Sequence, residues 1–161
     1  MPSVMAGRRK PAETELYEHV NLTPVVFLTV CIKDRRPILA QSDINDLLID
    51  IWSDEKSHWV VGRYVLMPDH LHLFCTPRSR ESLGIKKWVN FWKSKASNRW
   101  PRTDEYPIWL NDVWDTQLRT GESYSGKWKY VRNNPVRHGL VSNADDWPFQ
   151  GELTILHWHA P

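Results

Sequence analysis

The spacing of apolar residues changes along the chain, and these changes predict the order of strands and helices. The run from Val25 to Cys31 is apolar and rich in β-branched residues, which is typical of a buried central strand. After Ser42 the apolar residues recur three and four positions apart, as on one face of an amphipathic helix. That face consists of Ile44, Leu47, Leu48, Ile51 and Trp52. We expect Ser42 to be the N-cap residue of this helix.

Two further strands are predicted to form a hairpin. Residues 59–67 and 70–76 are two apolar runs, and the Pro-Asp pair between them is typical of a tight turn. Side chains alternate between the two faces of a strand, so the second run should present two different surfaces. The surface expected to face the helices is Leu71, Leu73 and Cys75. The opposite surface is expected to carry His70, His72 and Phe74.

The second half of the chain predicts a helix, a strand and a further helix. The helix over residues 82–100 has an apolar side, expected to be buried, formed by Ile85, Trp88, Val89 and Trp92. Its opposite, polar side carries Lys86, Asn90, Lys93 and Ser97. Trp109 and residues 113–118 predict a short strand. Residues 122–134 predict the last helix, which should end near Pro135 because proline disfavours helical geometry at the preceding residue.

The predicted order is strand–helix–strand–strand–helix–strand–helix. It matches an α+β, ferredoxin-like (RRM-like) sandwich with an antiparallel sheet, and the additional C-terminal helix should lie near the open sheet face. A chain of 161 residues can form one domain with a substantial core. We divide it into a basic N-terminal arm (residues 1–20), a catalytic domain (residues 21–150) and a C-terminal tail (residues 151–161).

The composition is that of an ordinary globular protein. Apolar residues make up 41% and charged residues 25%, and the net charge is only +2. Most of the ten tryptophans are expected in the core, while Trp100 or Trp128 could stack on an unpaired base. Cys31 and Cys75 are isolated in apolar segments, as in reduced core residues. No apolar run approaches the roughly 18 to 20 residues that cross a bilayer, so we expect a cytoplasmic protein without membrane contact.

Two histidines and a distant tyrosine carry the candidate chemistry. His70 and His72 lie two positions apart on a predicted strand, so both rings should point to the same face. Tyr130 and Asn134 lie four positions apart on the predicted helix. Two imidazoles and an amide oxygen can bind a divalent metal such as Mn, and a neighbouring tyrosine can attack a phosphodiester. A phenol must lose its proton near pH 7, at a cost of roughly 4 kcal/mol, so a nearby cation is required.

Three segments resemble a known family. They are Val65–Leu73, Trp114–Arg119 and, above all, Tyr130–Val141. Together they are similar to the HUH-type single-strand DNA transposases with one catalytic tyrosine, and within these to the REP-associated tyrosine transposases. The combination of Met-Pro-x-His-x-His with Tyr-x-x-x-Asn-Pro-Val is specific, whereas neither motif alone would be. The chain departs from this branch at Thr116, where a histidine is usual.

The resemblance implies a fold, an activity and a set of site residues. It implies a ferredoxin-like domain that cuts and transfers single-stranded DNA at short hairpins (REP-like DNA), with Mg or Mn bound by His70, His72 and Asn134. Tyr130 would be the catalytic residue and would stay joined to the 5′ phosphate, freeing a 3′ hydroxyl. The partner is then single-stranded or hairpin DNA, and the protein would act as a monomer or a homodimer.

Basic residues are the candidates for phosphate contacts, since such contacts supply most of the salt-dependent affinity for DNA. We select Arg8, Arg9, Lys10, Lys86, Lys87, Lys93, Arg119 and Arg132. Two other interpretations stay open. One is an RRM-like protein that binds hairpin DNA or RNA without catalysis. The other is a histidine-based nucleotide hydrolase, which would need a third alternating histidine where the chain has Phe74.

Overall fold

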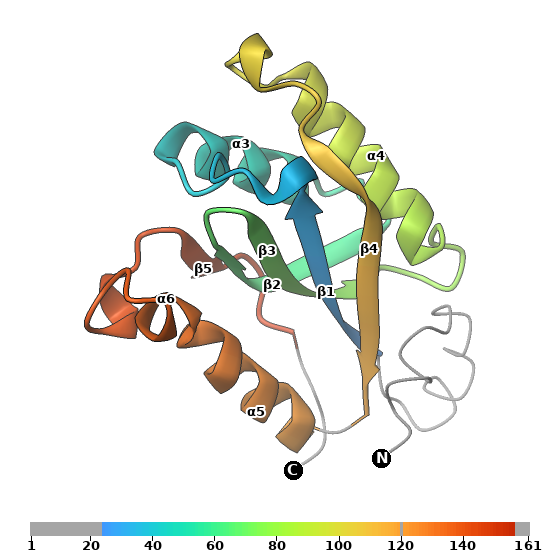
Figure 1. Ribbon diagram of the computed structural model, residues 1–161. Helices are drawn as coiled ribbons and strands as arrows, with labels where there is room; N and C mark the ends of the chain where they lie inside the picture. The colour runs from blue at the N-terminus through green and yellow to red at the C-terminus, as the bar shows by residue number, and fades with distance from the viewer. Residues whose placement is uncertain (1–23, 120, 157–161) are drawn as a thin grey trace.

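The computed structural model describes residues 24–119 and 121–156, which form a single sheet with helices on both faces (Figure 1). The predicted N-terminal arm, with Arg8, Arg9 and Lys10, lies outside the described residues. The strands are β1 (Val25–Ile32), β2 (Trp59–Leu66), β3 (His70–Pro77), β4 (Trp109–Leu118) and β5 (Gln150–Glu152). Their order is β4-β1-β3-β2-β5, and every pair is antiparallel. The predicted α+β sandwich is therefore confirmed.

Two helices cover one face of the sheet, and two others cover the opposite face (Figure 1). The first pair is α3 (Ser42–Trp52) and α4 (Ile85–Asn98), and the second is α5 (Gly121–Arg132) and α6 (Asn134–Arg137). Short 3-10 turns are η2 (Lys33–Arg35), η3 (Thr103–Glu105) and η4 (Ala144–Asp146). The additional helix near the second sheet face was predicted, and it carries Tyr130 as expected.

Tryptophans dominate the core beneath α3 and α4. Trp92 meets both Trp52 and Trp109 edge-on, with ring centroids 5.4 and 5.5 Å apart. Trp100 continues this chain of rings against Trp109 and is only 4% exposed. Its Nε1 donates to Glu105 Oε1, so Trp100 is a core residue and does not present a ring to solvent.

The apolar pattern of β3 divides the sheet as the sequence predicts. Leu71, Leu73 and Cys75 join the core beneath α3 and α4. Phe74 lies on the other face and packs against Tyr124 of α5, with ring centroids 4.9 Å apart. This second cluster also contains Leu156, which seats the segment after β5 against the sheet.

Gly62 explains how Leu156 fits there. A Cβ at position 62 would lie 2.6 Å from Cγ of Leu156, closer than non-bonded carbon atoms approach. The missing side chain in β2 therefore leaves the space that Leu156 fills. The strand β5 itself was not predicted, because its three residues lack an apolar pattern.

Two local predictions were wrong. Ser42 is the first residue of α3, and the N-cap is Gln41, whose side chain makes no capping hydrogen bond. Lys93 is buried rather than on the polar side of α4, because the start of β4 covers it. Its Nζ donates to the carbonyl of Leu110 over 2.7 Å, and burial lowers its pKa.

No helix within the described ranges is both long and apolar enough to span a membrane.

Candidate functional site

The two histidines lie at the start of β3, on the face of the sheet covered by α5. Cross-strand pairing sets His70 opposite Cys31 and His72 opposite Thr29 on β1. Both rings project to one side, as their spacing predicts, and meet edge-on with centroids 4.8 Å apart. The central strands hold them, so their backbone positions are rigidly set.

His70 is oriented by a carboxylate. Its Nδ1 lies 2.7 Å from Oδ1 of Asp69, which also accepts from Nε of Arg35 through its other oxygen. An ionised carboxylate can only accept, so Nδ1 carries the proton and Nε2 keeps its lone pair. Burial lowers the pKa of His70, although Asp69 acts in the opposite direction. This arrangement is the one in which a carboxylate orients a histidine toward a metal.

His72 is kept in its neutral form more strongly than His70. Burial, followed by the charge of His70, lowers its pKa to about 3. Its Nδ1 lies 2.9 Å from Oγ1 of Thr29, and its ring stacks on Phe27 at 5.1 Å. Neutral imidazole is the form that binds metals, so His72 needs no proton loss at pH 7 to act as a ligand.

A metal bound by His70 and His72 would need a third protein ligand that is not His, Cys, Asp or Glu. Within residues 24–119 and 121–156, no group of three or more such side chains is arranged to hold a metal ion. The predicted third ligand, Asn134, would supply an amide oxygen. It is the first residue of α6, is only 6% exposed, and is followed by Pro135, which suits the first helical turn. Two neutral imidazoles with an amide oxygen are a donor set that suits Mn²⁺.

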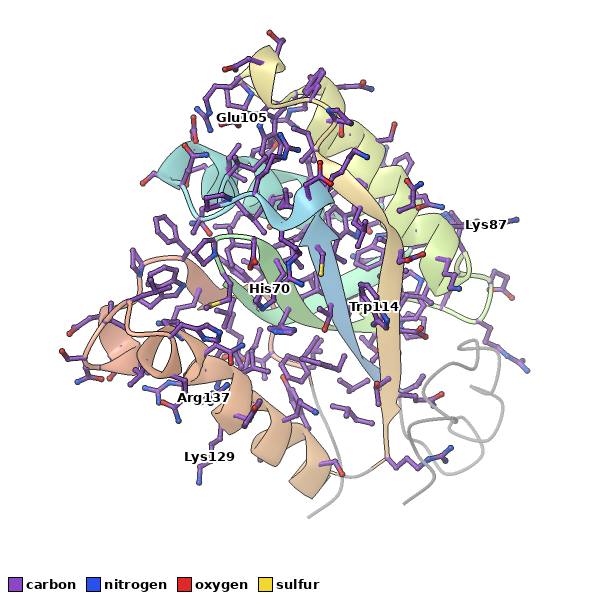
Figure 2. All side chains as sticks on the ribbon, viewed as in Figure 1. His70, Lys87, Glu105, Trp114, Lys129 and Arg137 are labelled. Carbon is purple, nitrogen blue, oxygen red and sulfur yellow. The ribbon has the colours of Figure 1, made fainter. Side chains whose placement is uncertain are left out.

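Tyr130 is exposed near the end of α5, with 62% of its surface accessible. The guanidinium carbon of Arg137 lies over its ring, 3.8 Å from the centroid. The same guanidinium donates to Oδ1 of Asn134. Arg137 therefore contacts both residues that the sequence pairs as nucleophile and ligand, and Figure 2 shows it on the α5–α6 side of the sheet.

The α5–α6 segment also adds positive charge around the histidines. The charges of Lys127 and Arg137 both lower the pKa of His72. Nζ of Lys127 lies 5.2 Å from the ring centroid of Phe27, on which His72 stacks. His138, just after α6, has the same effect on the pKa of His70. Anions such as phosphate are favoured at a surface with this charge.

Sequence reasoning did not select Arg137. It lies within the segment Tyr130–Val141, three residues after Asn134, which on a helix brings two side chains together. The spacing from Tyr130 is seven residues, or about two helical turns. The three-residue spacing from Asn134 was the available signal, whereas the contact with Tyr130 crosses the break between α5 and α6.

Two contacts anchor α5 at its ends. Near its start, the guanidinium of Arg63 in β2 lies over the rings of Tyr124 and Trp128, at 5.7 and 5.2 Å. At its end, Arg132 forms an ion pair with Asp145 of η4. Trp128 is thus covered on one side by Arg63, and its proposed base stacking stays a prediction.

The described basic candidates differ in accessibility. Lys86, Lys87 and Arg119 are exposed, the first two on α4 and the third just after β4. Figure 2 shows Lys87 projecting outward from α4. Arg132 shares its charge with Asp145, and Lys93 is buried.

Two curated proteins are similar in sequence to most of this chain. The REP-associated tyrosine transposase of Escherichia coli (strain K12) is 25% identical over 126 residues, which cover 76% of this chain and 73% of the relative. A candidate REP-associated tyrosine transposase of Haemophilus influenzae is 23% identical over 137 residues, covering 76% of each chain. No protein-family profile matches the sequence.

Solved structures agree on the fold. A REP-associated tyrosine transposase bound to a REP hairpin superposes with a TM-score of 0.66 and 23% identity, covering 80% of this chain and 76% of the other. A candidate transposase from Deinococcus radiodurans gives a TM-score of 0.50 and 18% identity, with coverage of 68% and 88%. The resemblance to REP-associated tyrosine transposases is therefore confirmed.

Proposed function

We propose that this chain is a metal-dependent endonuclease and strand transferase that acts on single-stranded DNA at REP-like hairpins. The observation that carries the proposal is the contact of one guanidinium, that of Arg137, with both Tyr130 and Asn134. The charge of the same residue also acts on His72.

In the proposed reaction, the phenol oxygen of Tyr130 attacks the phosphorus of a DNA phosphodiester. The bond from the tyrosine oxygen to phosphorus forms, and the bond from phosphorus to the 3′ oxygen breaks. The phenol proton is released, and the leaving 3′ oxygen gains a proton. The product is a 5′-phosphotyrosine with a free 3′ hydroxyl, and a second 3′ hydroxyl can reverse the step to join strands.

Divalent metal, Mg²⁺ or Mn²⁺, would be held by His70, His72 and Asn134, and when bound it stabilises negative charge on the phosphate. Asp69 orients His70 for this task, and burial keeps His72 unprotonated. Arg137 keeps the ring of Tyr130 and the amide of Asn134 in one place, so we assign it as a positioning residue.

The substrate class comes from the relatives. One similar structure is a transposase bound to a REP hairpin, and we extend hairpin recognition to this chain. The basic candidates Lys86, Lys87, Arg119 and Arg132 would contact phosphates, and the reaction would take place in the cytoplasm.

A second function, hairpin binding without cleavage, is favoured by one observation. Oδ1 of Asn134 already accepts from Arg137, so that oxygen is occupied by a cation of the protein itself. In a pure binding protein this contact would simply stabilise α6.

One experiment separates the two functions. A labelled hairpin oligonucleotide with single-stranded flanks is incubated with protein and Mn²⁺ or Mg²⁺, then run on a denaturing gel. The proposal expects a covalent adduct that is absent in Tyr130→Phe and in chelator. Tight binding on a native gel with no adduct in any metal would support the binding protein.

A further inference from the structure

The turn that follows β1 holds two consecutive residues in a backbone conformation that side chains rarely adopt. In η2, at the end of β1 (Figure 1), φ is 60° at Asp34 and 55° at Arg35. Left-handed geometry is unusual for a residue with a long side chain, and each instance costs conformational free energy. Such residues persist where the surrounding structure holds them, and they gather at functional sites.

Hydrogen bonds to two other segments hold this turn in place. The amide of Ile32 donates to the carbonyl of Asp69 over 2.9 Å, and the amide of Lys33 donates to the carbonyl of Ile108 over 2.9 Å. Arg36, which follows the turn, donates to two backbone carbonyls of the segment before β4. The turn is therefore fastened to the β2–β3 connection and to the segment before β4, and these contacts offset the strain of its backbone.

Arg35 contacts the carboxylate that orients His70. Its Nε donates to Oδ2 of Asp69 over 3.0 Å, while Oδ1 of Asp69 lies 2.7 Å from Nδ1 of His70. With both oxygens engaged, the carboxylate cannot rotate without breaking one of these two hydrogen bonds. The side chain of Arg35 is 56% exposed, and an ion pair this exposed contributes little to stability. The effect expected of Arg35 is therefore on the orientation of Asp69 rather than on the fold.

We infer that Arg35 is a positioning residue of the metal site and acts on His70 through Asp69. The inference rests on the proposed function, in which His70 is a metal ligand. The guanidinium holds the carboxylate, and the carboxylate keeps the proton of His70 on Nδ1. Nε2 then keeps its lone pair for the metal. The η2 turn brings the arginine from the end of β1 to the carboxylate just before β3.

The first measurement is calorimetric titration of the full-length protein with Mn²⁺ in the absence of DNA. Arg35→Gly removes the guanidinium and adopts the left-handed backbone without steric cost, so this variant should fold. Its Kd for Mn²⁺ should rise about tenfold, at the lower end of the range for residues that support a ligating histidine. Arg35→Lys keeps the charge and should recover part of this affinity.

The second measurement follows His70 in the metal-free protein. Long-range proton–nitrogen NMR correlation spectra distinguish the two neutral tautomers of imidazole, and the parent should show His70 protonated at Nδ1. Arg35→Gly should add a fraction of His70 that is protonated at Nε2. Arg99→Ala is the matched control, because it removes another exposed arginine, one that pairs with Asp50 at 2.9 Å. It should change neither the tautomer nor the affinity for Mn²⁺.

A double variant separates positioning from a general effect on the fold. If Arg35 acts through Asp69, Arg35→Gly should weaken Mn²⁺ binding in the parent but add nothing in Asp69→Asn, where the carboxylate is already lost. Equal losses in both backgrounds would overturn the inference, and so would an unchanged tautomer and affinity in Arg35→Gly. A loss of DNA affinity alone would also overturn it and would make Arg35 a phosphate contact.

The proposed function fails by a different readout, the absence of a Tyr130 adduct with DNA. Mn²⁺ binding that depends on Arg35 without any adduct would keep the positioning role and reject the chemistry. A parent protein that binds no Mn²⁺ would overturn both.

Discussion

Arg137 covers the ring of Tyr130 at 3.8 Å and donates from the same guanidinium to Asn134. A guanidinium can lie over a ring and still present N–H donors at its edge, whereas a lysine ammonium is a compact charge with no flat face. The nucleophile candidate and a ligand candidate are therefore fixed relative to each other before DNA binds.

Arg137→Ala should slow formation of the Tyr130 adduct by about 10- to 100-fold at saturating DNA, because the ring and the amide lose their common partner. Arg137→Lys should recover only a small part of this rate. Single-turnover rates and the Kd for an uncleavable hairpin are measured separately. Lys56→Ala is the control, because it also removes one positive charge, at an exposed position. If Arg137→Ala weakened only the binding of DNA and left the single-turnover rate unchanged, Arg137 would be a phosphate contact and not a positioning residue.

Asp69→Asn should weaken the binding of Mn²⁺ alone by about 10- to 100-fold, because the carboxylate that orients His70 is removed. Calorimetric titration of the protein with Mn²⁺ measures this without DNA. His70→Ala and His72→Ala should fold but bind no metal and cut no DNA. Asp104→Asn, at an exposed position, should bind Mn²⁺ normally. Cleavage that persists without either imidazole would remove the metal from the mechanism.

The metal-free protein should lose stability as the pH falls below about 6.5. The pKa of His72 is about 3 in the folded chain and 6.5 when exposed, so the unfolded state binds more protons in this interval. The contribution is complete above pH 6.5 and decreases by roughly 1.4 kcal/mol per pH unit below it. Urea unfolding at several pH values, with His72→Gln for comparison, isolates this residue. If the free energy of unfolding had the same pH dependence in the parent and in His72→Gln, the burial of a neutral His72 ring would be contradicted.

The salt dependence of DNA binding should separate Lys86 from Lys93. Lys86→Ala should reduce the log–log slope by about one, since an exposed lysine releases a counterion on contact. Lys93→Met should leave the slope unchanged, because its ammonium is buried against the carbonyl of Leu110. A reduced slope in Lys93→Met would show that α4 and β4 separate when DNA binds.

Arg63→Ala should destabilise the attachment of α5. Its guanidinium covers two rings of that helix and pairs with Glu152 of β5 at 3.4 Å. We expect a loss of about 1 kcal/mol in unfolding free energy, since exposed contacts of this kind are individually weak. Amide hydrogen exchange in α5 should rise more than in β1. Uniform faster exchange over the whole chain would point to global destabilisation instead.

The sequence predicted the features that depend on periodic burial. The alternation of β3 placed His70 and His72 on one face, because a buried strand permits only one register of apolar residues. The helical spacing of α3 identified its buried side for the same reason. Local composition was therefore enough for the sheet, its four main strands and the covering helices.

The errors arise where distant segments meet. Lys93 was placed on a polar face by its helical position, and only the later strand β4 covers it. The contact of Arg137 with Tyr130 crosses the break between α5 and α6 at Asn133, which the helical pattern did not predict. The strand β5 depends on pairing with Arg63–Val65 rather than on its own residues.

The packing of Leu156 connects the segment after β5 to α5, the helix that carries Tyr130. This leucine occupies the notch that Gly62 leaves and shares one apolar cluster with Tyr124 of α5. Displacing Leu156 would therefore disturb the packing of Tyr124 and, through it, the helix that bears Tyr130.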